Sequence, residues 1–126
     1  ASGWHDQKVG KLQSLHAYFR PYHFKKDRLG RAVALTEFGG YNYRCAGHSF
    51  GSADFGYKKL KSPADLQMAL EKLYSEQIKP AYKQGLSAAV YTQLSDVEEE
   101  VNGLVTYDRK VVKLPPETMR KIVNVE

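Results

Sequence analysis

The chain has 126 residues, of which 42% are hydrophobic and 26% are charged, and these ordinary proportions exclude wholesale disorder. Its single cysteine, Cys45, excludes an intrachain disulfide framework, so we expect a cytoplasmic protein. A net charge of +5 permits a phosphate-binding surface without requiring one, and no uninterrupted apolar run approaches the roughly 20 residues that cross a bilayer.

Two short apolar runs open the chain and predict strands. Residues 13–19 are apolar or aromatic at most positions, and Pro21 follows them, which is typical of a buried strand that ends in a loop. A polar turn over residues 25–31 leads into residues 32–36, a nearly continuous apolar run. Such a run is typical of a strand covered on both faces in a parallel sheet, and it predicts an α/β architecture.

A long loop and then a helix are predicted next. Residues 38–57 are rich in glycine and aromatic side chains and show no regular period, which predicts a long, ordered surface loop. Ser62 offers a helix N-cap, and Asp65 lies where a capping carboxylate belongs. We expect the helix to present one apolar face, to be bent or interrupted at Pro80, and to stop at Gly85.

The last third of the chain completes the predicted topology. Residues 86–91 form another short apolar strand, so the order strand, loop, helix, strand is that of a βαβ unit. An acidic loop over residues 96–100 and a turn at Asn102-Gly103 follow. A short closing helix is predicted over residues 115–123.

Glu37 is the leading candidate for a catalytic residue. It directly follows the buried strand and precedes Gly39-Gly40, which let the chain turn sharply. A carboxylate in this position lies at the carboxyl end of a strand, where α/β folds bind their ligands. The alternative is a structural role, in which Glu37 caps a turn or pairs with a nearby arginine.

Three stretches of the chain resemble, in order, the last three barrel strands of glycoside hydrolase family 2, the family of β-galactosidases, β-glucuronidases and β-mannosidases. SLHAY at residues 14–18 resembles the sixth strand, and LTEFGG at residues 35–40 resembles the nucleophile motif that ends the seventh. Residues 90–91 with residues 102–110 resemble the eighth strand and its loop. The resemblance implies that residues 1–126 are the C-terminal segment, about strands 6 to 8, of a (β/α)8 TIM barrel with parallel strands and flanking helices.

The same resemblance implies a reaction. Family members hydrolyse β-glycosides with retention through a covalent glycosyl-enzyme, so Glu37 would be the nucleophile and no cofactor is implied. Retention needs a second carboxyl group roughly 5 to 5.5 Å from the first. In the family this acid/base is a glutamate that follows an asparagine at the fourth strand, and no Asn-Glu pair occurs in this sequence. Since the chain also starts at Ala1 without a methionine, we expect a fragment of a longer enzyme that is inactive alone.

Four strand-end residues are implied to contact the sugar, each with a structural alternative. Tyr18 matches a tyrosine that hydrogen-bonds the nucleophile, or it is a half-buried strand aromatic. His16 stands where relatives carry a polar residue and can reach a sugar hydroxyl, or it is hydrogen-bonded in the core. Tyr91 replaces the eighth-strand tryptophan that forms a platform under the sugar ring. This departure, with Gln93 close by, leaves the sugar preference open.

Three loop residues complete the set of candidates. Asp96 falls at an acidic position of the relatives, which implies that it contacts substrate or shapes the pocket; the alternative is that it belongs to a solvated acidic run. Arg44 and His48 follow Glu37 and are candidates for contact with an aglycone or an acidic group, against a role as surface residues. The spacing of the histidines fits no metal-binding pattern, so we expect no metal.

Two other classes of function stay open. A noncatalytic carbohydrate-binding or assembly module would keep the sheet and the aromatic loop and give Glu37 a structural role. A basic nucleic-acid-binding domain would bind DNA or RNA in a salt-dependent way. The leading interpretation has a β-glycoside as partner, no nucleic acid and no membrane. Because three barrel strands leave open edges and apolar faces, we also expect the fragment to self-associate.

Overall fold

The computed structural model describes residues 3–18, 20–53, 55–56 and 58–125. At its centre is a three-stranded sheet with the order β1-β2-β5, in which both pairs of neighbours run parallel. The strands are β1 (Leu12–Ala17), β2 (Ala32–Gly39) and β5 (Ala88–Thr92). The predicted α/β class and the parallel arrangement of these three strands are therefore confirmed.

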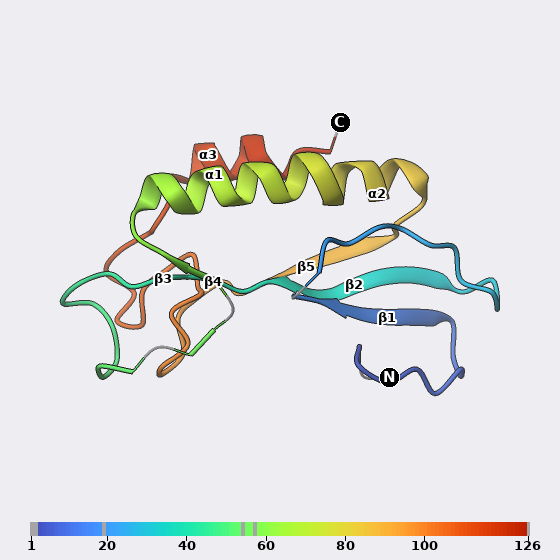
Figure 1. Ribbon diagram of the computed structural model, residues 1–126, viewed down its shortest axis with the longest axis horizontal. Helices are drawn as coiled ribbons and strands as arrows, with labels where there is room; N and C mark the ends of the chain where they lie inside the picture. Colours follow the sequence, from blue (N-terminus) through green and yellow to red (C-terminus); the bar gives the residue numbers. More distant parts are fainter. Residues whose placement is uncertain (1–2, 19, 54, 57, 126) are drawn as a thin grey trace.

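All helices lie on one face of this sheet (Figure 1). A continuous helical segment runs through α1 (Pro63–Leu73), a π-helical turn η1 (Tyr74–Ile78) and α2 (Lys79–Gln84). The second helix, α3 (Pro116–Val123), lies beside it in Figure 1. The N-terminal segment lies on the opposite side of the sheet, so the two ends of the chain are separated by the sheet and helix layers.

The helical segment begins, is interrupted and ends close to where the sequence predicts. The Ser62 side chain accepts a hydrogen bond of 3.1 Å from the backbone N–H of Asp65, which satisfies a free amide of the first turn. The π-helical turn ends at Ile78, two residues before Pro80, whose ring nitrogen cannot donate to the α-helical ladder. Gly85 closes the segment in the left-handed region, with φ 118°.

The hydrophobic core lies between the sheet and the helices. Leu35 and Phe38 of β2 are 0% and 1% exposed, and they belong to one cluster with Leu66 and Leu70 of α1. Burial of each such side chain contributes about 1.5 to 3 kcal/mol. Among the described residues, no helix covers the other face of the sheet, and Val90 of β5 is 56% exposed. This uncovered surface is called the open face below.

The predicted long loop is wrong in part. β2 continues to Gly39, and β3 (Tyr41–Tyr43) follows it and pairs in parallel with β4 (Lys58–Leu60). Asn42 Nδ2 also donates to the Phe55 carbonyl oxygen at 2.8 Å. These strands depend on main-chain pairing between segments distant in sequence, so no alternation of apolar residues in the sequence predicts them. Between them the described residues are irregular, as predicted.

The described residues form an open sheet with β1 and β5 at its edges. β3 and β4 lie beyond the carboxyl ends of the sheet strands (Figure 1). None of the helices in the described part of the chain has the length and apolar character that a membrane span requires.

Candidate active site

A β-bulge in the central strand sets the direction of Glu37. On β1, Leu15 pairs with Leu35 and the next residue, His16, pairs with Glu37, so β2 holds one extra residue at this point. The register with β5 shifts at the same place. Because of the bulge, Leu35 and Phe38 both point into the core, although they are three residues apart. The two residues between them are thereby left to the open face.

The residues of the open face surround a hollow of about 510 Å³. Alternate residues of β1 line it together with the two bulge residues Thr36 and Glu37. Ser14 Oγ lies 2.6 Å from Thr36 Oγ1, and this hydrogen bond ties β1 to the bulge. The hollow therefore presents hydroxyl, imidazole and carboxylate groups on a sheet surface, beside the irregular segment that precedes β1.

Glu37 is the centre of a polar cluster contributed by all three strands of the sheet. Its Oε2 accepts a hydrogen bond of 2.7 Å from the Tyr18 hydroxyl and lies 3.3 Å from His16 Nδ1. The Tyr18 oxygen also lies 2.9 Å from Thr92 Oγ1. A phenol has one proton, so when Tyr18 donates to Glu37 the Thr92 hydroxyl donates to Tyr18. The predicted neighbours His16 and Tyr18 thus meet Glu37.

The carboxylate of this cluster is held and yet accessible. The Glu37 side chain is 45% exposed, whereas the His16 side chain is 11% exposed. Tyr18 and His16 both contact Oε2, so this oxygen is fixed from the end of β1, and Thr92 of β5 in turn contacts Tyr18. A carboxylate fixed in this way can act as a nucleophile, as a base or as a hydrogen-bond acceptor for a polyhydroxylated ligand.

The structure does not bring Tyr91 to this cluster. Tyr91 pairs with Phe38 across β2 and β5, and the two ring centroids are 5.7 Å apart at an angle of 82° on the helix-covered face. A side chain at Gly39 would overlap the Tyr91 ring, so the glycine makes room for it. Burial raises the pKa of the Tyr91 phenol above its usual range. Tyr91 is a core residue here, and Thr92 is the β5 residue that joins the Glu37 cluster, through Tyr18.

Gln93 organises the loop after β5. Its Nε2 donates to Asn102 Oδ1 at 2.7 Å and to Glu100 Oε2 at 3.1 Å. Its carbonyl oxygen accepts from the Leu104 N–H at 3.1 Å. Both donor hydrogens of the amide are engaged within the loop, so the side chain supports the structure of the loop.

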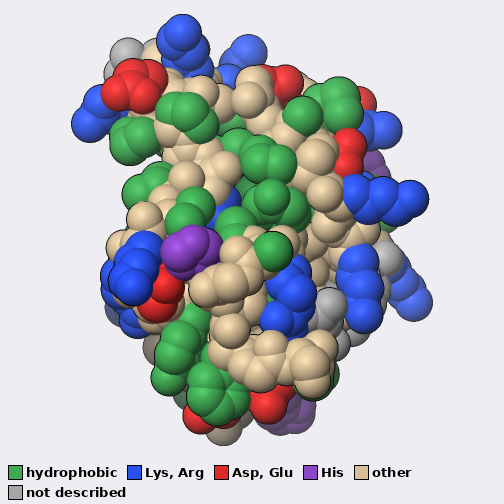
Figure 2. Space-filling view, turned by 90° about the vertical axis from the view of Figure 1, so that its left-hand side faces the viewer, with side chains coloured by type: hydrophobic (Ala, Val, Ile, Leu, Met, Phe, Trp, Pro, Cys, Tyr) green, Lys and Arg blue, Asp and Glu red, His purple; other side chains and the backbone are tan. Residues whose placement is uncertain are grey.

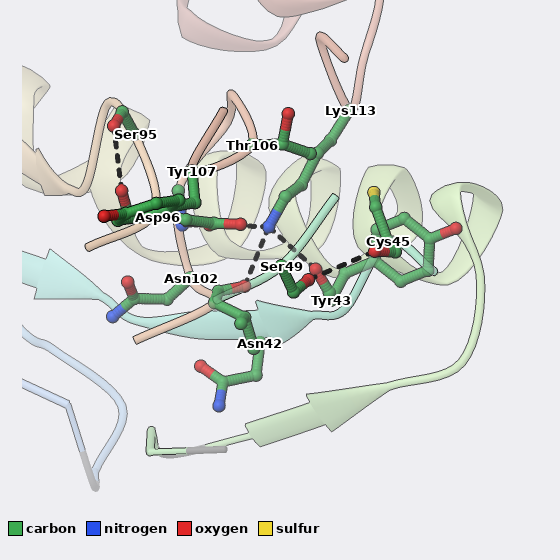
Figure 3. Close-up of polar contacts among 12 residues, drawn as sticks. Asn42, Tyr43, Cys45, Ser49, Ser95, Asp96, Asn102, Thr106, Tyr107 and Lys113 are labelled. Atoms are coloured by element: carbon green, nitrogen blue, oxygen red, sulfur yellow. Dashed lines mark hydrogen bonds and ion pairs between the residues drawn. The ribbon is translucent and has the colours of Figure 1, made fainter. Parts of the chain in front are cut away.

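Asp96 has a structural partner that the sequence does not announce (Figure 3). Its side chain and that of Lys113 are both 0% exposed, and Lys113 Nζ lies 2.7 Å from Asp96 Oδ1. Nζ also donates to the carbonyl oxygens of Tyr43 at 2.7 Å and Val101 at 2.9 Å, which uses all three ammonium protons. Figure 3 shows the lysine between the loop after β5 and β3. A carboxylate buried in this way does not face a ligand.

Arg44 and His48 hold the loops beyond the sheet. The Arg44 guanidinium donates to the carbonyl oxygens of Gly51, at 3.0 Å, and Ala53. His48 Nδ1 lies 2.8 Å from Asp108 Oδ2, and this hydrogen bond holds the pKa of the Asp108 carboxyl well below its usual range. The Arg44 contacts stay within the loop after β3, and the His48 contact joins that loop to the loop after β5. Neither residue contacts the Glu37 cluster in the described part of the chain.

Figure 2 looks onto the end of the molecule to which these loops belong. Lys and Arg side chains lie along both sides of that end, and hydrophobic side chains are exposed between them. The net charge of +5 is therefore partly displayed around the carboxyl ends of the strands. Such a surface offers both charged and apolar groups to a ligand.

Sequence reasoning overlooked Thr92 as a site residue. Thr92 is adjacent to Tyr91 in sequence, and the bulge in β2 decides which of the two side chains points to which face of the sheet. The hydroxyl pair of Ser14 and Thr36 was also overlooked, although both belong to the stretches that resemble the family. Residues two apart in a strand share a face. Ser14 is two residues before His16 on β1, so its hydroxyl could have been expected on the same face as His16.

No protein-family model matches this chain, and no curated protein matches it either.

Proposed function

We propose that this chain is part of the catalytic barrel of a retaining β-glycosidase similar to glycoside hydrolase family 2, with Glu37 as the nucleophile. The observation that carries the proposal is the geometry of Glu37. Its carboxylate stands near the carboxyl end of the central parallel strand, on the open face, 2.7 Å from the Tyr18 hydroxyl. Catalytic groups of (β/α)8 enzymes come from the carboxyl ends of several strands. The last three strands of such a barrel are adjacent and parallel and carry helices on one face. The three strands of this sheet have the same arrangement.

The proposed reaction has two steps at one carbon. In the first, the Glu37 carboxylate attacks the anomeric carbon and the bond to the leaving oxygen breaks, while a second carboxylic acid gives that oxygen a proton. In the second, water attacks the same carbon, the second carboxylate takes a proton from the water, and Glu37 is released. One water is consumed and the β configuration is retained.

The neighbours of Glu37 have defined tasks in this scheme. The Tyr18 hydroxyl holds Oε2, so the carboxylate keeps one orientation during attack. His16 lies 3.3 Å from the same oxygen and lines the hollow, so we propose that it contacts a sugar hydroxyl bound there. Thr92 keeps Tyr18 in place from β5. The cluster thus positions the nucleophile through side chains from three strands.

The second carboxyl group must come from outside this chain. In the family, the acid/base glutamate directly follows an asparagine, and this sequence has no Asn-Glu pair. β1 and β5 are edge strands, which are the places where further barrel strands would pair. We therefore propose that the acid/base stands roughly 5 to 5.5 Å from Glu37 on a strand contributed by another part of the full-length protein.

The test uses the full-length protein with a panel of p-nitrophenyl β-glycosides. We expect Glu37→Gln to lower kcat at least about a thousandfold without changing the fold, because the amide cannot form the glycosyl ester. A 2-deoxy-2-fluoro glycoside should label the peptide that contains Glu37, as read by mass spectrometry. Glu76→Gln, on the exposed surface of the helical segment, is the matched control and should leave kcat unchanged.

Two results would overturn the proposal. One is unreduced turnover by the Glu37→Gln variant, and the other is covalent label on a different residue. If the wild-type protein binds β-glycosides and hydrolyses none of the panel, a noncatalytic carbohydrate-binding module replaces the enzyme.

A further inference from the structure

Trp4 stands beside the Glu37 cluster, although nothing in the sequence links the two. It is the single tryptophan of the chain, and it is 61% exposed. Its ring centroid lies 5.1 Å from that of His16, at an angle of 78°, and 6.1 Å from that of Tyr18, at an angle of 32°. Both of these residues contact Glu37 Oε2. An accessible indole therefore borders the carboxylate, one side chain away.

The backbone holds this indole in place. The His16 N–H donates to the Gly3 carbonyl oxygen at 3.2 Å, which fastens the segment before Trp4 to the edge of β1. A side chain at Gly3 would overlap the His16 ring, so glycine permits this close approach. Further along, Asp6 makes a bidentate ion pair with Arg31 at 2.6 and 2.8 Å. The segment that carries Trp4 is thus anchored on both sides.

The other tyrosines near Glu37 in the described part of the chain are engaged in other contacts. Tyr91 packs into the core with Phe38, and β5 offers the Thr92 hydroxyl to the cluster instead. Tyr18 uses its hydroxyl on Glu37 and packs its ring near Trp4. A sugar ring has an apolar C–H face as well as hydroxyl edges, and the face of an aromatic ring complements that C–H face.

We infer that Trp4 is the sugar-stacking residue of the Glu37 site and binds the C–H face of a pyranose ring whose anomeric carbon faces the carboxylate. The inference rests on the proposed function for the orientation of the sugar. It adds a residue from the irregular N-terminal segment to a site otherwise built from strand ends. The ligand class is a β-linked pyranoside, with the ring stacked on the indole and its hydroxyl groups toward His16 and Glu37.

The experiment measures binding separately from turnover. The full-length protein with the Glu37→Gln change binds substrate without consuming it, and methyl β-glycosides of glucose, galactose, mannose and glucuronic acid are titrated by calorimetry. In this background we expect Trp4→Ala to weaken the best ligand about tenfold and Trp4→Tyr to restore most of the affinity, since an aromatic face suffices. Saturation-transfer NMR should show the strongest contacts at C–H protons of one sugar face, and these contacts should be lost in Trp4→Ala.

The matched control is Tyr82→Ala, which removes an exposed aromatic side chain from α2, on the other side of the sheet. It should leave the affinity unchanged. Unchanged affinity in Trp4→Ala, or the absence of binding by all four glycosides, overturns the inference. If Trp4→Ala loses the ligand while the wild-type protein hydrolyses no glycoside, the stacking role stands and the proposed enzyme fails.

Discussion

The Tyr18 hydroxyl lies 2.7 Å from Glu37 Oε2; Tyr18 directly follows β1, and Glu37 belongs to β2, the parallel neighbour of β1. The same hydroxyl lies 2.9 Å from Thr92 Oγ1 of the third strand. A tyrosine near the end of an edge strand therefore connects both other strands of the sheet. In the proposed glycosidase, this connection fixes the nucleophile before substrate arrives.

Removal of this hydroxyl should impair the proposed catalysis more than the fold. We predict that Tyr18→Phe lowers kcat roughly tenfold to a hundredfold in the full-length protein, because the carboxylate loses the donor that orients it. KM should change less, since the phenol ring stays. Steady-state kinetics on the best glycoside of the panel, with circular dichroism to check the fold, measures both.

Two variants control for this prediction. Thr92→Val, which touches Glu37 only through Tyr18, should lower kcat by a smaller factor. Tyr82→Phe removes a hydroxyl from the exposed face of α2 and should have no effect. A wild-type kcat in Tyr18→Phe would show that the hydrogen bond does not serve the reaction.

The buried pair of Asp96 and Lys113 should be a major contributor to stability once one partner is removed. Both side chains are 0% exposed, and Lys113→Met leaves the carboxylate in the interior without its cation. We predict a loss of about 3 to 5 kcal/mol in the free energy of unfolding. Urea denaturation of the chain, followed by circular dichroism, gives this value.

The double variant distinguishes the pair from the packing around it. Asp96→Leu combined with Lys113→Met should recover most of the loss, because no uncompensated charge remains. Lys83→Met, on the exposed surface of α2, should stay within about 0.5 kcal/mol of the wild type. A loss below about 1 kcal/mol in Lys113→Met would contradict the pair as an interior anchor.

The sequence was sufficient to predict the elements that depend on residues close together in the chain. Apolar runs predicted the three sheet strands, and Ser62, Pro80 and Gly85 predicted the start, the interruption and the stop of the helical segment. Each of these signals depends on neighbours within one turn of helix or a few residues of strand. Glu37 could be singled out for the same reason, since it directly follows the apolar part of its strand.

The faces of site residues were harder to predict because they depend on register. Tyr91 and Thr92 are consecutive, so one of them faces the core and the other faces Glu37, and strand pairing with a bulged β2 decides which. Asp96 looked like a loop carboxylate because its partner Lys113 comes 17 residues later in sequence. Trp4 belongs to an irregular segment, where no period indicates which strand it will contact.

Arg31 should make stability depend on acidity below pH 4. It pairs with Asp27 and Asp6, and the hydrogen bond from its guanidinium lowers the pKa of Asp27 from 3.8 to about 2 and that of Asp6 still further. A lowered pKa in the folded chain means that the stabilisation is complete above the ordinary value and is lost as the pH falls toward the folded value. We predict that the urea midpoint declines between about pH 4 and pH 2.

The contribution of Arg31 can be separated from that of other carboxylates. Arg31→Met should be less stable than the wild type at pH 6, and the difference between the two urea midpoints should shrink toward pH 2, where Asp27 gains a proton. Arg28→Met, at an exposed arginine close by, should track the wild type at every pH. A difference that stays constant from pH 6 to pH 2 would assign the effect to packing.

The open face and the sheet edges should make the 126-residue chain associate with copies of itself when it is produced alone. β5 is an edge strand, and its Val90 is 56% exposed on the face that no helix covers in the described part of the chain. Exposed apolar residues on an unpaired edge favour pairing with a second chain. We predict a concentration-dependent dimer or larger species by sedimentation, which Val90→Lys shifts toward monomer because a charge on the edge opposes pairing.

Met68→Lys, at a residue of α1 that is 59% exposed, should leave the distribution unchanged. If the wild-type chain sediments as a monomer at every concentration, the exposed β5 edge does not drive association, and the sheet needs no partner.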